Sequence, residues 1–331
     1  MDSLYLKTQN EHKFTSTGVK FWKHMNKMNS YRNGTGNSII STHISPEGSC
    51  NLNCSYCSVK KRDRHFRIKL HTIQDYVEKL CSRGLKAVIL TGGGEPTLYP
   101  HFNTLVKWLK RQNLSVALIT NGTNADNVLT WDDFSWVRVS INIFKNWQKT
   151  IHIPKIAGTL GCSFIYTGQT IAEIQKVADL AHNLGAKYVR ILPDCLPDEL
   201  LLQYKKIDEI LKAIDDPIFF CQFKVHNTPK ANICHQAYFR PYLSEIDNGT
   251  VYPCDSIVLN DSAEMFDRKF QICKASEILD FLDNKIIMKH DIKTDCKGCV
   301  FTDNINMLDS WKSAGKIQNT FKDDIEHGDF V

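Results

Sequence analysis

Between residues 38 and 192, short apolar segments alternate with amphipathic ones, and this alternation constrains the fold more than any other feature. Short runs rich in β-branched and aromatic residues predict strands, and longer segments with apolar residues at helical spacing predict helices. The clearest helix is expected at 171–184, where Ile174, Val177 and Leu180 follow that spacing. Six strands are predicted, at 38–44, 87–90, 115–119, 137–141, 162–166 and 188–192. The other helices are expected at 73–83, 102–112, 125–129 and, less regularly, after Trp147.

Strands that alternate with helices in this way form a parallel sheet through right-handed crossovers. Six units are too few for a closed eight-fold barrel. The sequence therefore predicts the α/β class and a (β/α)6 partial TIM barrel. Sites in such folds lie at the carboxyl ends of the strands, so chemistry-bearing residues are sought there.

The alternation stops after Pro193. A helix at 198–214 and a strand at 219–225 are expected, and beyond them the sequence is rich in cysteine without a strand–helix repeat. Three parts are predicted: an N-terminal extension at 1–37, with a short helix near 19–25 at the edge of the fold; the partial barrel at 38–225; and a small α+β cysteine-rich domain at 226–331.

Composition constrains the size of the core, the charge of the partners and the cellular compartment. The chain has 331 residues, of which 42% are hydrophobic, so a sizeable core is available. The formal net charge of +5 permits an anionic substrate but does not require nucleic acid. No signal-peptide pattern and no apolar run long enough to cross a membrane are seen, so we expect no membrane association and a cytoplasmic protein. In that compartment, twelve cysteines favour metal binding over disulfides.

A cysteine loop directly follows the first predicted strand. Cys50, Cys54 and Cys57 have the spacing C-x3-C-x2-C, which differs from the paired C-x2-C of a structural zinc site. Three thiolates leave a metal site one ligand short. In an iron–sulfur cubane they would leave one iron open to a non-protein ligand. A zinc loop with an unseen fourth ligand and unrelated buried thiols are the alternatives.

Further motifs follow the next strands. Gly92-Gly93-Gly94-Glu95 follows the second strand, Thr120-Asn121 the third, and Ser140 and Asn142 lie at the fourth. Glycines without a Cβ permit the backbone to approach a ligand closely. The basic stretch at 60–64 is interpreted as a solvated loop.

Taken together, residues 38–192 resemble the radical S-adenosylmethionine (radical SAM) superfamily. The resemblance implies that the three cysteines hold a [4Fe–4S] cluster whose open iron is chelated by the amino and carboxylate groups of SAM. It implies reductive cleavage of SAM to a 5′-deoxyadenosyl radical, with the electron supplied by an external flavodoxin- or ferredoxin-like reductant. The SAM contacts implied are Tyr56, Gly93, Gly94, Glu95, Thr120, Asn121, Ser140, Asn142 and Arg190. For Arg190, an ordinary ion pair is an equal alternative.

A second cysteine set resembles the SPASM and twitch domains of radical SAM enzymes. Cys234 and Cys254, followed by the Cys296–Cys299 pair, match the twitch layout, with a β-hairpin after the first cysteine and a helix at 275–284 before the pair. The resemblance implies one auxiliary [4Fe–4S] cluster, saturated by four thiolates. A four-cysteine zinc site is the alternative. Cys273 is an alternative ligand, although it lies where the pattern expects none.

The resemblance implies hydrogen-atom abstraction, and by analogy dehydrogenation or epimerisation of a small polar metabolite. The alternatives are maturation of a ribosomally made peptide by epimerisation or crosslinking, and modification of a nucleotide or nucleic acid. A metal-binding protein without activity is a further possibility. Lys145, Tyr166 and Asp194 follow predicted strands and are candidates for contact with the substrate.

Overall fold

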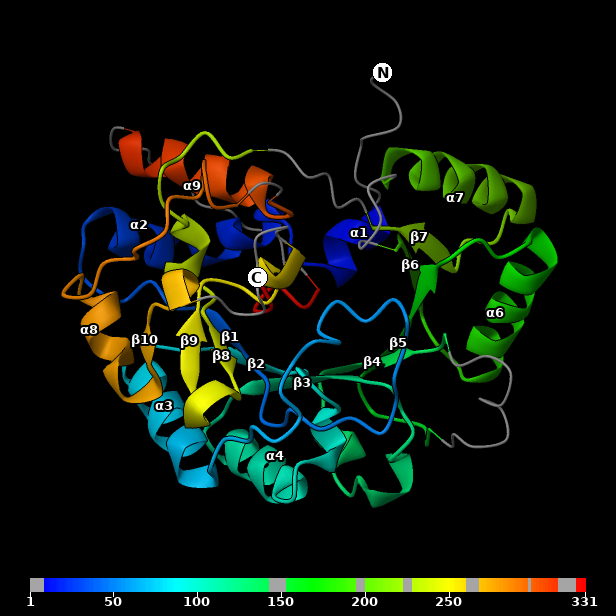
Figure 1. Ribbon diagram of the computed structural model, residues 1–331, viewed down its shortest axis with the longest axis horizontal. Coiled ribbons are helices and arrows are strands. Elements are labelled where there is room, and N and C mark those ends of the chain that lie inside the picture. The colour runs from blue at the N-terminus through cyan, green and yellow to red at the C-terminus, as the bar shows by residue number, and fades with distance from the viewer. Residues whose placement is uncertain are drawn as a thin grey trace.

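A single ten-stranded sheet organises the chain in the computed structural model (Figure 1). The structure describes residues 9–142, 153–194, 200–222, 228–259, 268–296, 299–314 and 326–331. The strand order is β10-β9-β8-β1-β2-β3-β4-β5-β6-β7. The strands are β1 (Ser41–Ile44), β2 (Ala87–Leu90), β3 (Ser115–Thr120), β4 (Trp136–Ser140), β5 (Thr159–Tyr166), β6 (Val189–Pro193), β7 (Phe219–Cys221), β8 (Tyr242–Ser244), β9 (Thr250–Tyr252) and β10 (Cys273–Lys274).

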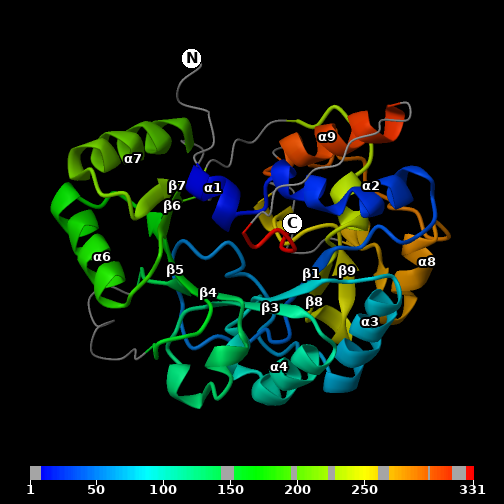
Figure 2. The same ribbon diagram turned by 180° about the vertical axis from the view of Figure 1, so that it is seen from behind.

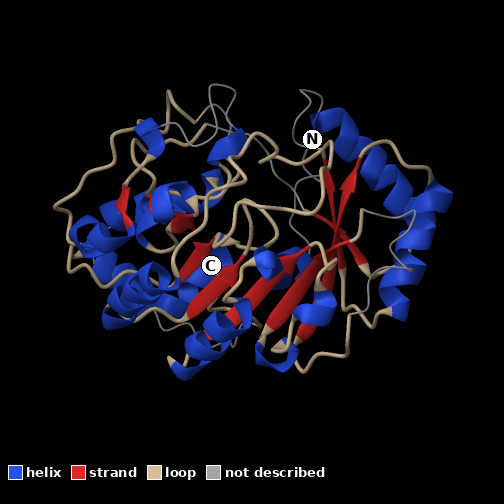
Figure 3. Cartoon of the chain, turned by 60° about the horizontal axis from the view of Figure 1, so that its bottom comes forward, coloured by secondary structure: helices blue, strands red, loops and turns tan. Residues whose placement is uncertain are grey.

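The partial barrel predicted from the sequence is confirmed. Strands β1 to β7 pair in chain order, every neighbour parallel, with Ile44 beside Leu90 and Leu90 beside Leu118. All six strands predicted between residues 38 and 192 are present. Figure 3 shows them as one curved sheet with the long helices along its outer side.

The predicted helices are also found, with small shifts at their ends. They are α3 (Leu70–Ser82), α4 (Phe102–Arg111), α6 (Ile171–Asn183) and α7 (Leu200–Ile214). The start of α6 is fixed by a capping box, in which the Thr170 side chain accepts from the Glu173 N–H and the Glu173 carboxylate accepts in return. The short helix expected at 125–129 is a 3-10 turn at Ala125–Asn127. The helix expected after Trp147 begins in residues outside the described ranges.

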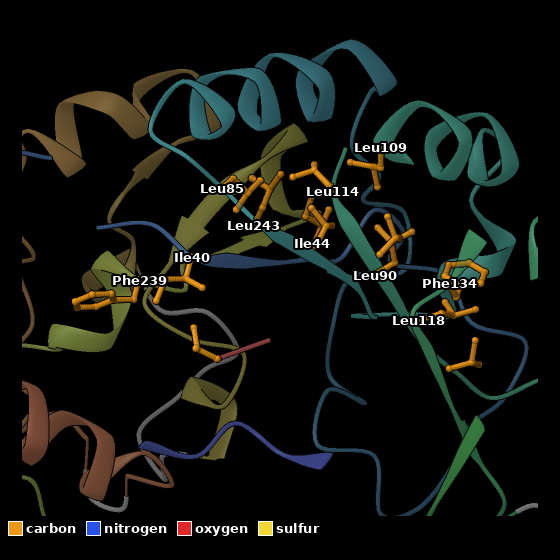
Figure 4. Packing of buried hydrophobic residues seen from close by; sticks show 14 of the residues in the cluster. Ile40, Ile44, Leu85, Leu90, Leu109, Leu114, Leu118, Phe134, Phe239 and Leu243 are labelled. Atoms are coloured by element: carbon orange, nitrogen blue, oxygen red, sulfur yellow. The ribbon is translucent and has the colours of Figure 1, made fainter. Parts of the chain in front are cut away.

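Most of the core lies between the outer face of the sheet and its helices. Figure 4 shows Leu90 and Leu118 of adjacent strands beside Leu109 of α4 and Phe134. The inner face carries a smaller cluster, in which Phe330 packs on Ala87, Ile89, Ala117 and Trp136. The C-terminal residues thus lie inside the arc of strands, as Figures 1 and 2 show. They lie near the amino ends of the strands, because Phe330 packs on Ala87 and Trp136, the first residues of β2 and β4.

Strands of the cysteine-rich part continue the barrel sheet. β8 pairs in parallel with β1, and β9 pairs antiparallel with both β8 and β10. Gly249 begins the return of the β8–β9 hairpin in the left-handed region, at a φ of 113°. The helix expected at 275–284 is present as the 3-10 turn Ala275–Glu277 and α8 (Ile278–Leu282). The twitch-like hairpin and helix are therefore found, while the division of the chain into three parts stays a prediction.

The N-terminal segment packs into the fold more extensively than the short edge helix expected from the sequence. It contains α1 (Gln9–Phe14), a 3-10 helix at Gly18–His24 and α2 (Met25–Arg32), and it fully buries Phe21 and Met28. α1 packs against β7, and α2 packs against α9 (Thr302–Ser313), so the segment spans from one sheet edge to the cysteine-rich part (Figure 2). No helix in the described part of the chain is long and apolar enough to cross a membrane.

Candidate active site

The cysteine loop and the glycine-rich segment are joined at the carboxyl ends of β1 and β2. The Gly94 N–H donates to the Glu47 carbonyl at 2.8 Å, and the Glu95 N–H donates to the Ser49 carbonyl at 2.8 Å. A Cβ on Gly94 would overlap the Ser49 carbonyl oxygen, and one on Gly93 would overlap the Glu245 carboxylate. Glycine is thus needed here for packing within the protein, a reason additional to the ligand approach expected from the sequence.

Glu47 holds the cysteine loop in place through hydrogen bonds, and no sequence motif identifies it as part of the site. Its side chain is 1% exposed and accepts from the Ser49 N–H at 3.0 Å and from Arg67 Nε at 2.5 Å. The ion pair with Arg67 compensates the buried charge. Arg62 also holds the loop, because its Nε donates a hydrogen bond to the Gly48 carbonyl at 2.8 Å.

The three loop cysteines line one hollow, and donors surround their sulfurs. Cys50 Sγ lies 3.5 Å from the Leu52 N–H and 3.7 Å from Asn121 Nδ2, while Cys57 Sγ lies 3.6 Å from Arg62 Nη1. Within the described ranges, no three His, Cys, Asp or Glu side chains converge on one metal-ion position. A [4Fe–4S] cluster binds its thiolates through separate irons, so its ligands need not converge on a point. The donor set fits such a cluster.

The Glu95 carboxylate accepts four hydrogen bonds inside the hollow. Oε1 accepts from the Thr97 N–H at 3.2 Å and from the hydroxyls of Thr97 at 2.7 Å and Thr120 at 2.6 Å, while Oε2 accepts from the Asn121 N–H at 2.7 Å. Burial raises the pKa of this carboxyl, and the hydrogen bonds oppose that rise. Glu95 therefore ties the glycine-rich segment to the end of β3.

The hollow gathers most of the residues predicted for SAM. Its lining contains the three loop cysteines and Tyr56, Gly93, Gly94, Glu95, Thr120, Asn121 and Ser140. Burial and a hydrogen bond with Cys54 raise the pKa of the Tyr56 hydroxyl. Lys60, Arg62 and Arg64 also line it, so the basic stretch interpreted as a solvated loop partly faces the site.

Asn142 and Arg190, which are also predicted to contact SAM, do not line the cysteine hollow. Asn142 bridges two strands, donating to the Ile165 carbonyl at 2.7 Å and accepting from the Ile165 N–H at 2.8 Å. Arg190 stands in register with Ser163, which is in register with Ser140, but it lines a deeper hollow. Contact of these two residues with SAM stays a prediction.

Of the substrate candidates, Lys145 lies outside the described residues. Tyr166 ends β5 and is buried, and its carbonyl accepts from the Asp194 N–H at 3.1 Å. Neither side chain lines the cysteine hollow.

The second hollow lies deeper inside the barrel, and the sequence did not reveal it. It borders the cysteine hollow through Ile119, which lines both. Phe330 and Trp136 line its wall. We call it the interior hollow; its charged lining residues and histidines are Glu11, Lys13, Lys20, His43, Arg138, Arg190, Arg240, Asp255 and His327.

The four cysteines of the C-terminal set share a third, small cavity. Cys234, Cys254, Cys296 and Cys299 all line it, and burial raises the pKa of the thiols of Cys234, Cys254 and Cys299. Their neighbouring thiols raise the pKa values of Cys234 and Cys254 further. Cys273 lies outside this lining, in β10.

Comparison with known proteins identifies the part of the chain that holds the cysteine hollow. Residues 44–199 match the family described as the Radical SAM superfamily. The chain contains a radical SAM domain. That family uses a [4Fe–4S] cluster and SAM, and the cysteine hollow supplies three thiols and a closely approached backbone segment for them.

Curated relatives match over part of the chain. The chain is 31% identical over 159 residues to the Helicobacter pylori "UPF0026 protein", covering 41% of this chain and 51% of the relative. It is 30% identical over 150 residues to an "S-adenosylmethionine-dependent nucleotide dehydratase" of Flammeovirga pacifica, covering 42% of this chain and 51% of the relative. The chain thus spans about half the length of the curated relatives it matches.

A solved structure extends the likeness of fold beyond the barrel. anSMEcpe with bound AdoMet superposes with a TM-score of 0.53 at 15% identity, covering 81% of this chain and 88% of that one. At this identity the likeness concerns the fold.

Proposed function

We propose that this radical SAM protein is an enzyme that abstracts a hydrogen atom from a small polar substrate held inside the barrel, leading to dehydrogenation or epimerisation. One observation carries the proposal: the interior hollow adjoins the cysteine hollow through Ile119. When bound, the cluster and SAM supply a 5′-deoxyadenosyl radical. Phe330 and residues of α1 line the interior hollow, which suits a small ligand better than an extended peptide.

The chain's own residues would act by binding and orienting. Cys50, Cys54 and Cys57 would hold the cluster, while Asn121 and Arg62 place hydrogen-bond donors beside two of the sulfurs. Glu95, through its bonds to Thr97, Thr120 and Asn121, would fix the segment that receives the methionine end of SAM. Ser140 would contact the ribose. An external one-electron reductant remains part of the proposal.

We also propose that Cys234, Cys254, Cys296 and Cys299 hold a second [4Fe–4S] cluster, within a C-terminal unit at 226–331. Their shared cavity supports this assignment. Because four thiolates would saturate the cluster, it would not bind substrate through iron.

Anaerobic reconstitution followed by dithionite and SAM tests the activity. The expected product is 5′-deoxyadenosine, measured by chromatography. A protein that carries its full complement of iron and still forms no 5′-deoxyadenosine would refute the enzymatic proposal.

A nucleotide is the second candidate substrate. Relatives named nucleotide dehydratases match this chain, and the interior hollow is basic. Incubation with ribose-deuterated nucleotides tests it, because abstraction transfers deuterium into 5′-deoxyadenosine. Mass spectrometry that finds deuterium from none of them would exclude these nucleotides.

A further inference from the structure

The interior hollow holds more positive than negative charge. Its cationic side chains are Lys13, Lys20, Arg138, Arg190 and Arg240, and its carboxylates are Glu11 and Asp255. Asp255 is engaged by Arg240 Nη2 at 3.3 Å and by His43 Nδ1 at 3.4 Å. Glu326 forms an ion pair with Lys13 at 3.9 Å and also acts on Lys20, and even with it the carboxylates among the described residues are too few to neutralise these five cations.

Arg138 is a buried cation with neutral partners. It is 5% exposed, and it donates from Nε to the Tyr188 hydroxyl at 3.1 Å and from Nη2 to the Phe14 carbonyl at 2.5 Å. Its guanidinium also lies 5.1 Å from the Trp136 ring centroid. No carboxylate among the described residues is within ion-pair distance, so its charge is left without a counter-ion there.

Lys20, on the N-terminal 3-10 helix, is a second buried cationic side chain without an ion-pair partner among the described residues. Its side chain is 2% exposed, and no described residue accepts a hydrogen bond from its ammonium or forms an ion pair with it. Burial, followed by repulsion from Arg138, lowers the pKa of Lys20 to about 7. Burying an unpaired charge costs about several kcal/mol. Arg138 keeps its charge and Lys20 is partly charged near pH 7, so together they indicate a place for an anion.

The position of this pair suits a substrate. Arg138 precedes Ser140 by two residues on the same face of β4, so the two Cα atoms are separated by about 7 Å along the strand. Ser140 lines the cysteine hollow and Arg138 the interior hollow. An anion held at Arg138 would lie one strand repeat deeper than the predicted ribose contact.

We propose that Lys20 and Arg138 bind a phosphate group of the substrate, which makes the substrate a phosphorylated small metabolite. The inference rests on the proposed function and specifies its substrate class. A phosphate dianion or a diphosphate matches the excess positive charge better than a single carboxylate does. Guanidinium also matches phosphate geometry with two parallel N–H donors.

Calorimetric titration of the reconstituted, SAM-loaded protein tests the inference without turnover. The probes are inorganic phosphate, pyrophosphate and acetate. Pyrophosphate is expected to bind more tightly than acetate, and Lys20→Met and Arg138→Gln should each weaken it by about tenfold or more. Exposed lysine and arginine residues supply the matched controls Lys107→Met and Arg111→Gln, which should bind like the wild type.

The outcomes separate this inference from the proposed function. Absence of phosphate and pyrophosphate binding, binding unaffected by both substitutions, or tighter binding of acetate would each overturn the phosphate site. Two variants are used because Arg138 also supports Tyr188; circular dichroism before and after loading shows that each is folded. If phosphate binds as expected but 5′-deoxyadenosine never forms, the anion site stands and the enzymatic proposal fails.

A second inference comes from His290, which lines the cavity of the four C-terminal cysteines. Its side chain is buried, and neither Nδ1 nor Nε2 has a hydrogen-bond partner among the described residues. A neutral imidazole carries one N–H donor, and leaving it buried and unpaired costs about 1–3 kcal/mol. The ring is held against Phe270, with the centroids 5.1 Å apart.

We infer that His290 donates its N–H to a sulfur of the group that these four cysteines hold. Hydrogen bonds to cluster sulfurs stabilise the reduced state, so His290 would be a positioning residue that raises the reduction potential of the auxiliary cluster. The sequence missed it because His290 lies outside the cysteine spacing that defines the set.

Redox titration followed by electron paramagnetic resonance tests this role. His290→Phe should keep the wild-type iron content and lower the midpoint potential of one cluster, and His290→Asn, which keeps an N–H, should restore part of it. The exposed-histidine variant His71→Phe should match the wild type. An unchanged potential would overturn the inference, and loss of iron in His290→Phe would instead make His290 a ligand.

Discussion

The Thr120 hydroxyl donates a hydrogen bond of 2.6 Å to the Glu95 carboxylate and thereby joins the carboxyl end of β3 to the glycine-rich segment after β2. The Asn121 N–H donates to the other carboxylate oxygen at 2.7 Å. One buried side chain therefore sets the relative position of two loops of the cofactor hollow. Asn121 extends the connection to Cys50, with Nδ2 3.7 Å from Sγ.

Replacing Glu95 with Gln should weaken SAM binding by about tenfold, because an amide NH2 would face donors and leave one of them unpaired. Equilibrium dialysis with SAM measures the loss. Glu78→Gln, at an exposed position on α3, is the control. Unchanged SAM affinity in folded Glu95→Gln would show that the network does not position the site.

Replacing a cysteine should affect SAM cleavage differently in the two cysteine sets. Cys54→Ala should abolish SAM cleavage, because two thiolates cannot hold the open cluster, whereas Cys299→Ala should retain some cleavage. Iron analysis and 5′-deoxyadenosine formation measure both. Persistent cleavage by Cys54→Ala would contradict the ligand assignment.

Metal content decides what the C-terminal set binds. Two [4Fe–4S] clusters require about eight irons per chain, whereas about four irons with one zinc indicate a structural zinc site. Cys273→Ala should leave the metal content unchanged, because Cys273 lies in β10 and outside the cavity of the other four. Loss of four irons in Cys273→Ala would identify it as a ligand.

The sequence predicted the barrel well because its strands and helices are encoded locally. The apolar run at 87–90 and the capping box at Thr170 and Glu173 each specify their own segment. The cysteine loop was equally visible, since its three thiols lie within eight residues. Local spacing and the position after β1 were enough to place it at the strand ends.

Residues that meet only through the topology were not predictable. Lys20 and Arg138 are far apart in sequence, and each alone is indistinguishable from a surface cation. They share a hollow because the N-terminal segment packs across the barrel, a contact that no periodicity encodes. The same holds for Glu245, which comes from the cysteine-rich part and lies against Gly93.

The pH dependence of anion binding provides a final prediction. Besides burial, the charged groups acting on Lys20 are Arg138 on β4, Glu326 on the C-terminal segment and Lys23 on its own helix. Burial, the largest effect, and Arg138 lower the pKa of Lys20 to about 7, so Lys20 loses its proton as the pH rises above 7 in the unliganded protein. A bound dianion favours the charged ammonium and raises that pKa.

Binding above pH 7 must therefore take up a proton, and affinity should fall by up to about tenfold per pH unit until the pKa of the complex is reached. Sulfate is the suitable probe, since it stays a dianion throughout this range. Calorimetry between pH 7 and 9, in two buffers of different ionisation enthalpy, measures both affinity and proton uptake. Lys20→Met should bind sulfate more weakly at pH 7 and show little dependence on pH. A wild-type affinity that stays constant from pH 7 to 9 would mean that Lys20 does not face the bound anion.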